Sequence, residues 1–217
     1  MNDFDDFYIM DGVLISYKGN GGDIIIPSEV KEIGDNAFSG SDIMSLRAYN
    51  NLSRIGEKAF LNCLSLSAVC IGSEQEQATA SLSEDDGEGV ETEICESAFS
   101  GCSALKKVKL SDCVKRIGNR GFYGCYSLEN ITMPNGIKSI GERAFLGCGF
   151  LTSISIPNGI TSIDEFVFQG CQRLTDILIP SGVTVIDNGA FGYCRGLESI
   201  IIPDRESISD LHPTISY

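Results

Sequence analysis

The sequence has a single histidine, His212, and no Cys-x-x-Cys pair among its nine cysteines. Zinc sites and Ser–His or Cys–His nucleophiles need imidazoles or paired thiolates, so the usual forms of both are unsupported. The chain also lacks the Gly-x-Ser-x-Gly and Gly-x-x-x-x-Gly-Lys motifs that carry hydrolase and phosphate chemistry. We therefore predict no catalytic residues, no cofactor and no metal.

Long apolar runs and an excess of basic residues are absent as well. No segment approaches the roughly 18–20 apolar residues of a membrane span, so no membrane insertion is predicted. The net charge of −14 argues against nucleic acid, because phosphate contacts need clustered Lys and Arg. The acidic start Met1–Asp6 does not resemble a signal peptide. The localisation stays open between the cytoplasm and, if a signal was removed, the cell surface or medium.

What the chain does contain is a repeat marked by phenylalanine. Successive copies are separated by 22, 39, 23, 23, 23 and 23 residues. The marker residues are Phe38, Phe60, Phe99, Phe122, Phe145, Phe168 and Phe191. A fixed period between 20 and 30 residues is the signature of a solenoid, in which each coil buries its apolar face against its neighbours.

Other positions of the repeat keep the same register. Ile lies five residues before every Phe, and Cys lies three residues after six of the seven, with Ser41 in the first copy. Leu lies six residues after the Phe, and Met44 is its predicted substitute in the first copy. Apolar residues follow at nine and eleven, and Pro at twelve in the last four copies.

These positions predict structure. The segment Leu-x-x-Ile-x-Ile-Pro alternates apolar and polar residues, which is typical of a short strand with one buried face. Pro-Asn-Gly at 134–136 and 157–159 is turn chemistry, and the Ala-Phe turn places its ring in the interior. The predicted fold is an α/β repeat solenoid with a parallel β-sheet on one face and short turns or 3₁₀ segments elsewhere.

The frame from Ile156 through Phe168, Cys171, Leu174 and Ile179 resembles the Treponema-type leucine-rich repeats of BspA-like proteins. The resemblance covers roughly residues 24–203 and implies a right-handed leucine-rich-repeat solenoid of about seven 22–23-residue coils. The segment 8–17 looks like the β-hairpin cap that often precedes such arrays. BspA-like proteins are generally surface or secreted binding proteins, and the resemblance carries over no catalytic residue.

Three segments follow from this pattern. Residues 1–23 are predicted as the N-terminal hairpin cap, 24–203 as the solenoid, and 204–217 as a degenerate tail or short cap. The step from Phe60 to Phe99 is 16 residues longer than the regular period, which predicts an inserted loop at 72–92. Between Ile71 and Cys95 there are eight acidic residues and no basic one. This loop is either simply solvated or a docking loop for calcium or a partner, although it lacks EF-hand spacing.

The cysteines that share one repeat position are predicted to form a reduced, buried column. Stacked side chains point the same way, which disfavours disulfides between coils. Cys70 falls on an outward strand position and is the predicted exposed thiol.

Outward strand residues are free of the repeat constraint and are therefore the candidate binding face. Three lysines on one strand contrast with the acidic chain; either they balance the insertion or they begin a graded binding face. The candidate residues are Lys106, Lys107, Lys109, Glu129, Asn130, Thr132, Thr175, Asp176, Leu178, Glu198, Ser199 and Ile201.

The predicted function is non-enzymatic protein binding through this face, in BspA-like adhesion to host or matrix protein. The alternative is an intracellular scaffold that uses the same face. The frame stops after Pro203, although Ile208 is one residue from the next expected Ile. This leaves two possibilities for the C-terminal end: weak self-association through an uncovered edge strand, or a short cap in which Ile208 and Leu211 fold back.

Overall fold

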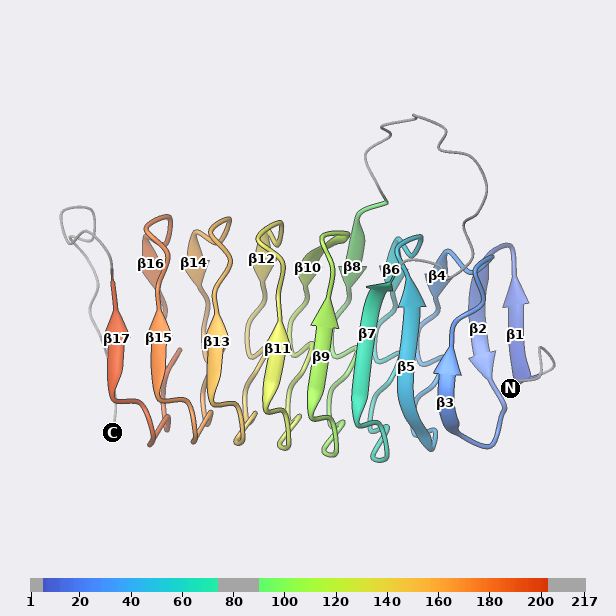
Figure 1. Cartoon of the computed structure of the whole chain (residues 1–217), viewed down its shortest axis with the longest axis horizontal. Coiled ribbons are helices and arrows are strands. Elements are labelled where there is room, and N and C mark those ends of the chain that lie inside the picture. Colours follow the sequence, from blue (N-terminus) through green and yellow to red (C-terminus); the bar gives the residue numbers. More distant parts are fainter. Residues whose placement is uncertain (1–5, 74–89, 203–217) are drawn as a thin grey trace.

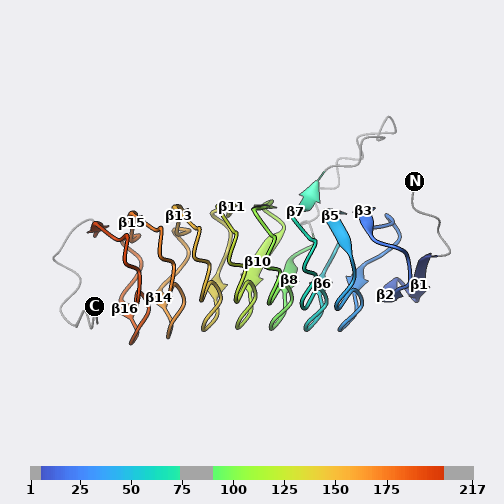
Figure 2. The same cartoon turned by 90° about the horizontal axis from the view of Figure 1, so that it is seen from below.

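The computed structural model describes residues 6–73 and 90–202, which form an elongated solenoid with two rows of strands (Figure 1). Seen from below, the rows form two layers joined by the turns (Figure 2). We call one row the front strands: β3 (Gly22–Ile25), β5 (Ile43–Tyr49), β7 (Ala68–Ser73), β9 (Lys107–Leu110), β11 (Asn130–Thr132), β13 (Ser153–Ser155), β15 (Asp176–Leu178) and β17 (Ser199–Ile201). The other row holds the back strands: β4 (Glu32–Ile33), β6 (Arg54–Ile55), β8 (Thr92–Ile94), β10 (Val114–Ile117), β12 (Ser139–Ile140), β14 (Ser162–Ile163) and β16 (Val185–Ile186).

An antiparallel hairpin begins the described chain. Its strands are β1 (Phe7–Met10) and β2 (Val13–Tyr17), and β2 pairs in parallel with β4, so the hairpin extends the back row. The ring of Tyr17 stacks on Phe38 with centroids 5.0 Å apart. The hairpin thus covers the first coil with both backbone and aromatic contacts.

The front strands pair in parallel within two groups, β3-β5-β7-β9-β11 and β13-β15-β17. Inward residues align across them, as Leu46 does with Val69 and Val69 with Val108. The strands shorten along the chain, from seven residues in β5 to three in β11, β13, β15 and β17. Pro134, Pro157 and Pro180 follow three of the short strands, and Pro has no N–H with which to continue a ladder.

The back row refines the predicted architecture, which placed a sheet on one face only. In each back strand, an Ile lies five residues before the repeat Phe. The N–H of the next residue donates to the carbonyl of the equivalent Ile in the preceding coil, as from Gly118 to Ile94 at 2.7 Å and from Gly141 to Ile117 at 2.9 Å. This bonding turns a predicted turn segment into a short strand. Because the described segments contain no α-helix, the fold is a parallel β-solenoid and the α/β label does not describe it well.

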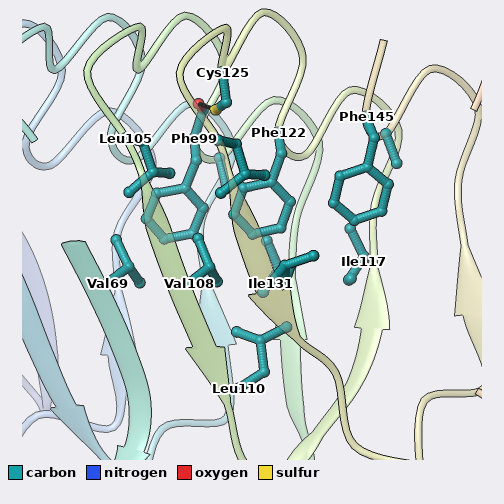
Figure 3. Close-up of a cluster of buried hydrophobic side chains, with 14 of the residues drawn as sticks. Val69, Phe99, Leu105, Val108, Leu110, Ile117, Phe122, Cys125, Ile131 and Phe145 are labelled. Carbon is teal, nitrogen blue, oxygen red and sulfur yellow. Dashed lines mark hydrogen bonds between the residues drawn. The ribbon is translucent and has the colours of Figure 1, made fainter. Parts of the chain in front are cut away.

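The repeat phenylalanines form one continuous column inside the solenoid. Six of the seven are at most 1% exposed, and Phe191 is 7% exposed. Adjacent rings are stacked with centroids 4.8–5.7 Å apart. In Figure 3 the rings of Phe99, Phe122 and Phe145 lie side by side, with Val108 and Ile131 packed near them. The prediction that the Phe ring fills the interior is confirmed.

Two positions in each Phe turn adopt left-handed backbone conformations. One lies two residues before the Phe and the other two residues after it. The first is occupied by Asn36, Lys58, Ser97, Arg120, Arg143, Phe166 and Gly189, and the second by Gly40, Asn62, Gly101, Gly124, Gly147, Gly170 and Tyr193. Such conformations are unfavourable for most residues. At eleven of these fourteen positions the N–H donates to a carbonyl oxygen of the next coil, as from Lys58 to Glu96 at 3.1 Å, which helps to offset that cost.

The cysteine column is buried and reduced, and its thiols act as hydrogen-bond donors. Each Sγ donates to the carbonyl oxygen of the Phe in the preceding coil, as Cys125 does to Phe99 at 3.2 Å (Figure 3). The same contact recurs from Cys63 to Cys194 at 3.0–3.4 Å. All nine cysteines are free. The prediction treated these thiols only as small apolar groups, so their donor role is an addition.

The predicted repeat register is wrong at one position, Met44. Met44 was expected at the buried Leu position of the first copy, but its side chain is 56% exposed. Ile43 is fully buried and holds that position. Ser45 pairs with Ala68, so Ile43 is equivalent to Leu66. The first copy is one residue shorter between Phe and strand, and a one-residue slip exchanges the two faces of a strand.

The inserted segment leaves the repeat register intact on either side. Residues 74–89 lie outside the described part of the chain, as do 1–5 and 203–217. Beyond the insertion, Glu93 and Ile94 pair with Arg54 and Ile55. The division into a cap at 1–23, a solenoid at 24–203 with an insertion at 72–92, and a tail at 204–217 stays a prediction. Within the described residues there is no helix long and apolar enough to cross a membrane.

Candidate functional site

The outward side chains of the front strands form two rows across the N-terminal half of the solenoid. The first row runs through Asp23, Ser45, Ala68, Lys107 and Asn130, which are cross-strand partners. The second row runs through Ile25, Arg47, Cys70, Lys109 and Thr132 in the same way. Strand alternation places these residues outward because their neighbours Leu46, Val69 and Val108 point into the core.

A depression lies where these rows cross β7. Its volume is about 360 Å³. We call it the basic groove; the outward residues in its lining are Ser45, Arg47, Ala68, Cys70, Lys107, Lys109, Asn130 and Thr132. The floor is low at β7 because Ala68 and Cys70 are small, whereas Arg47 on β5 and Lys109 on β9 are long. The groove is therefore a direct result of residue size along two aligned rows.

The groove carries cations, and none of the described residues in its lining is a carboxylate. The first-row carboxylate on the next strand, Asp23, accepts a hydrogen bond from the hydroxyl of Ser45 at 2.7 Å. No ion pair joins Lys107 or Lys109 to a carboxylate within residues 6–73 and 90–202. Both lysines are exposed.

Acidic residues gather elsewhere, along the turn three residues before the Phe. This turn edge carries Asp35, Glu57, Glu96, Glu142 and Glu165, all exposed. Ion pairs neutralise part of it: Arg54 lies 2.6 Å from Asp35, and Arg120 lies 3.2 Å from Glu96. Burial raises the pKa of the Asp35 carboxyl, but the Arg54 guanidinium and the Glu57 N–H together outweigh it, so the pKa is lowered. The basic groove thus differs in sign from the turn edge.

Six more of the predicted residues form a second group, which we call the C-terminal patch. It consists of Thr175, Asp176, Leu178, Glu198, Ser199 and Ile201 on and before β15 and β17. Leu178 and Ile201 are cross-strand partners and are 55% and 54% exposed. Ser199 donates to Asp176 at 2.5 Å, and this bond lowers the pKa of the Asp176 carboxyl.

Ten of the twelve predicted residues fall into two groups on the front row. Lys107, Lys109, Asn130 and Thr132 line the basic groove, whereas the C-terminal patch lies at the other end of the front row. Lys106 and Glu129 precede their strands and do not line the groove. A graded face that runs from lysines to apolar residues was the prediction, and no contact among these groups tests it.

Sequence reasoning missed Arg47 and Ala68, which complete the groove. The shortened first copy shifts Arg47 to the position where later copies carry an inward residue, so the repeat alignment hid it. It also missed an aromatic cluster at the turn before the front strands. The Arg173 guanidinium lies 3.8 Å from the centroid of the Phe150 ring, and Tyr126 contacts that ring edge-on at 5.1 Å. Two partners thus already contact the Phe150 ring.

The thiols divide by environment. Burial raises the pKa of Cys125, Cys148 and Cys171, which disfavours their reactive thiolate form. At the C-terminal end, where Cys194 is only partly buried, burial raises the pKa of that thiol to about 11. Cys70 is partly exposed in the groove, between Arg47 and Lys109. No group of three or more His, Cys, Asp or Glu side chains in the described segments is arranged to hold a metal ion.

Comparison with known proteins assigns the repeat to a family. The profile of the BspA-type leucine-rich repeat region matches six copies at residues 16–82 and 92–212. The chain belongs to the BspA-type leucine-rich repeat family. No curated protein sequence matches it.

Two solved structures illustrate the family fold. A leucine-rich repeat protein of Treponema pallidum is 26% identical with a TM-score of 0.77, over 91% of each chain. A leucine-rich repeat protein of Bacteroides ovatus is 29% identical with a TM-score of 0.70, over 87% of this chain and 47% of that one. The chain therefore spans about half the length of the Bacteroides protein.

Proposed function

We propose that this leucine-rich-repeat protein is a non-enzymatic binding module that holds a protein ligand on the outward face of its front strands. The main support for this proposal is the contrast between the two sides of each front strand. Inward side chains repeat from coil to coil and are buried, whereas outward ones change from coil to coil and are exposed. Solenoids commonly bind along such surfaces, because side chains there can vary without disturbing the core.

The BspA-type family favours adhesion to a host or matrix protein, at the cell surface or after secretion. A second candidate is an intracellular scaffold that uses the same face. The two candidates differ in the compartment of the ligand, not in the surface that binds it.

The test is capture of host matrix proteins, and separately of native cytosolic proteins, by the immobilised chain. The front variant Lys109→Glu/Leu178→Asp changes one residue in each part of the face. The matched control Arg116→Glu/Val185→Asp makes the same kinds of change on the exposed side of back strands β10 and β16. We expect the front variant to lose the ligand and the control to keep it. Equal capture by both variants would contradict the proposal.

We also propose weak self-association through the C-terminal end. Within residues 6–73 and 90–202, β17 is the last strand of its sheet, and Ile201 adds exposed apolar surface there. Unpaired edges tend to pair with another chain. Ile208 and Leu211, the predicted alternative cap, lie outside the described residues. Light scattering across a concentration series should show a rising mass that Ile201→Lys abolishes; a constant monomer mass together with protease-resistant residues 204–217 would favour the cap.

A further inference from the structure

The basic groove contains two cations that the strand register separates by a fixed distance. Arg47 pairs with Cys70, and Cys70 pairs with Lys109. Neighbouring strands lie about 4.8 Å apart, so the backbones of Arg47 and Lys109 are about 10 Å apart. In an extended or polyproline-II peptide, side chains two or three residues apart are separated by about 7–10 Å. Two carboxylates of one short extended segment therefore match this spacing.

Other groove residues suit the rest of such a segment. Ser45, Asn130 and Thr132 supply polar groups at the two sides, and the floor at Ala68 is small and apolar. Beyond the groove lining, Ile25 on β3 is 49% exposed and Met44 at the start of β5 is 56% exposed, so apolar surface lies beside the groove. A ligand with a few acidic residues flanked by apolar ones would use both features.

The charge of the whole chain limits how anionic the ligand can be. A net charge of −14 repels a long polyanion wherever it extends beyond the groove. The acidic turn edge adds to that repulsion. A nucleic acid or highly sulfated glycan needs a longer basic surface than this groove offers. A short acidic peptide places its carboxylates only where the cations are.

Resting on the proposed function, we propose that the basic groove binds an extended acidic segment of a partner protein, with carboxylates at Arg47, Lys107 and Lys109 and the chain over Ala68 and Cys70. The cations at the sides of the groove select a ligand by its charge, and the shallow side chains of the floor select it by its fit. These two contributions can be changed separately, because Ala68 is neutral and outward-facing.

The test measures fluorescence anisotropy with a labelled peptide of about ten residues that contains glutamates and leucines. Its counterpart carries glutamines in place of the glutamates. We expect binding to weaken at least about tenfold for the glutamine peptide and for Lys107→Glu/Lys109→Glu, because several charge contacts are lost or reversed together. Ala68→Leu should weaken it several-fold by filling the floor. Lys31→Glu/Arg116→Glu, with the same change in net charge away from the groove, should leave it within about twofold.

Alkylation locates the bound peptide. Cys70 lies in the groove floor, so saturating peptide should slow its reaction with iodoacetamide, whereas the partly exposed Cys95 and Cys113 should react at unchanged rates. Mass spectrometry of the digested protein gives all three rates in one experiment. Equal protection of the three cysteines, or none at Cys70, would overturn the assignment.

Three other results would overturn the proposal. One is equal affinity for the glutamate and glutamine peptides. Another is tighter binding of heparin with the same sensitivity to Lys107→Glu/Lys109→Glu, which would assign the groove to an anionic glycan. The third is a large gain in peptide affinity when residues 74–89 are replaced by a short Gly-Ser linker, which would make the chain's own acidic insertion the occupant.

The proposed function can survive a failure of this inference. In the capture assay, loss of the ligand in a Leu178→Asp/Ile201→Asp variant but not in Lys107→Glu/Lys109→Glu would keep binding on the front face and remove it from the groove. Retention of the ligand by both variants would remove the front-face function itself.

Discussion

The N-terminal and C-terminal halves of the solenoid share one repeat but stack differently. Ring centroids are 4.8 and 4.9 Å apart along Phe38, Phe60 and Phe99. They are 5.7 and 5.6 Å apart along Phe145, Phe168 and Phe191. Front strands β5 and β7 have seven and six residues, whereas β13, β15 and β17 have three each. The coils whose sequences repeat most regularly are thus the more widely spaced ones.

Hydrogen bonding shows the same difference. Both strand ladders are interrupted at one place, between β11 and β13 on the front and between β12 and β14 on the back. A void of about 10 Å³ lies beside the back interruption, lined in part by Ile140, Ile160 and Ile163. Pro134, Pro157 and Pro180 follow the three-residue strands β11, β13 and β15, and Pro27 follows the four-residue strand β3 at the same offset, whereas the longer strands β5 and β7 have no such proline. Repeat regularity therefore reports which side chains face inward, and not how closely the coils bond.

The largest expected effect is at the phenylalanine column. Phe60→Ala and Phe145→Ala should each cost about 3–5 kcal/mol in the free energy of unfolding, since truncating a buried Phe leaves a cavity. The cost should be larger at Phe60, because its neighbouring rings lie 4.8 and 4.9 Å away, against 5.6 and 5.7 Å at Phe145. Denaturant titration measures both.

Tyr123→Ala is the control for these variants, because Tyr123 is a turn residue that is 40% exposed. It should cost less than about 1 kcal/mol. An unchanged midpoint for Phe145→Ala would refute the column as core. A larger cost at Phe145 than at Phe60 would refute the contrast between the two halves.

A smaller effect is expected where a proline is introduced after β9. Ser111 occupies the repeat position of Pro134, and its N–H donates to the Ile71 carbonyl at 3.1 Å. Ser111→Pro should cost about 1–3 kcal/mol, because the bond is lost and its acceptor is left unpaired. The reverse change, Pro157→Ser, should shift stability by less than about 1 kcal/mol. Equal costs would show that proline does not cause the difference in strand length.

The thiol column should make the protein less stable at alkaline pH. Burial raises the pKa of Cys125, so the folded state keeps a proton that the unfolded state loses above about pH 8.5. The unfolded state then binds fewer protons, and stability falls as the pH rises. Relative to Cys125→Ser, the wild type should lose up to about 1.4 kcal/mol per pH unit between about pH 9 and 10.5.

Cys194 provides the comparison at the C-terminal end. Its pKa is raised only to about 11, so the corresponding loss relative to Cys194→Ser should stop increasing near that pH. At Cys148, where burial raises the pKa of the thiol well above its usual range, the loss relative to Cys148→Ser should continue to higher pH. Denaturant midpoints measured across this pH range distinguish the two. Parallel curves for both pairs of proteins would show that the column is no better shielded than its end.

The sequence predicted much of this fold because the inward residues are chosen by packing. The Phe, Cys and Ile positions are read directly from the period, and their burial follows. The left-handed turn positions could not be predicted in the same way. Asn36, Ser97 and Arg120 have no common chemistry, and hydrogen bonds to the next coil, not side-chain type, hold their backbones.

The candidate site was less predictable than the core. Lys107 and Lys109 were found because β9 belongs to a regular copy. Arg47 was hidden by a one-residue shortening, and the groove depends on the small size of Ala68 and Cys70 between longer neighbours. Such a depression can be predicted only when the registers of β5, β7 and β9 are known together. The repeat pattern of a single coil does not contain that information.

The smallest expected effect is a gain in stability at the last turn. Tyr193 has a φ of 57°, at a position where five other copies have Gly. Tyr193 is 62% exposed, so its side chain contributes little packing. Tyr193→Gly should relieve about 1 kcal/mol of left-handed strain, partly offset by the greater freedom of Gly in the unfolded chain.

Asn62→Gly is the matched change in the first half, where φ is 55°. Because Asn tolerates this conformation, the change should be close to neutral. Thermal unfolding of both variants tests the difference, and a loss of stability in Tyr193→Gly would show that the Tyr193 ring stabilises the C-terminal coil by contacts stronger than its exposure indicates.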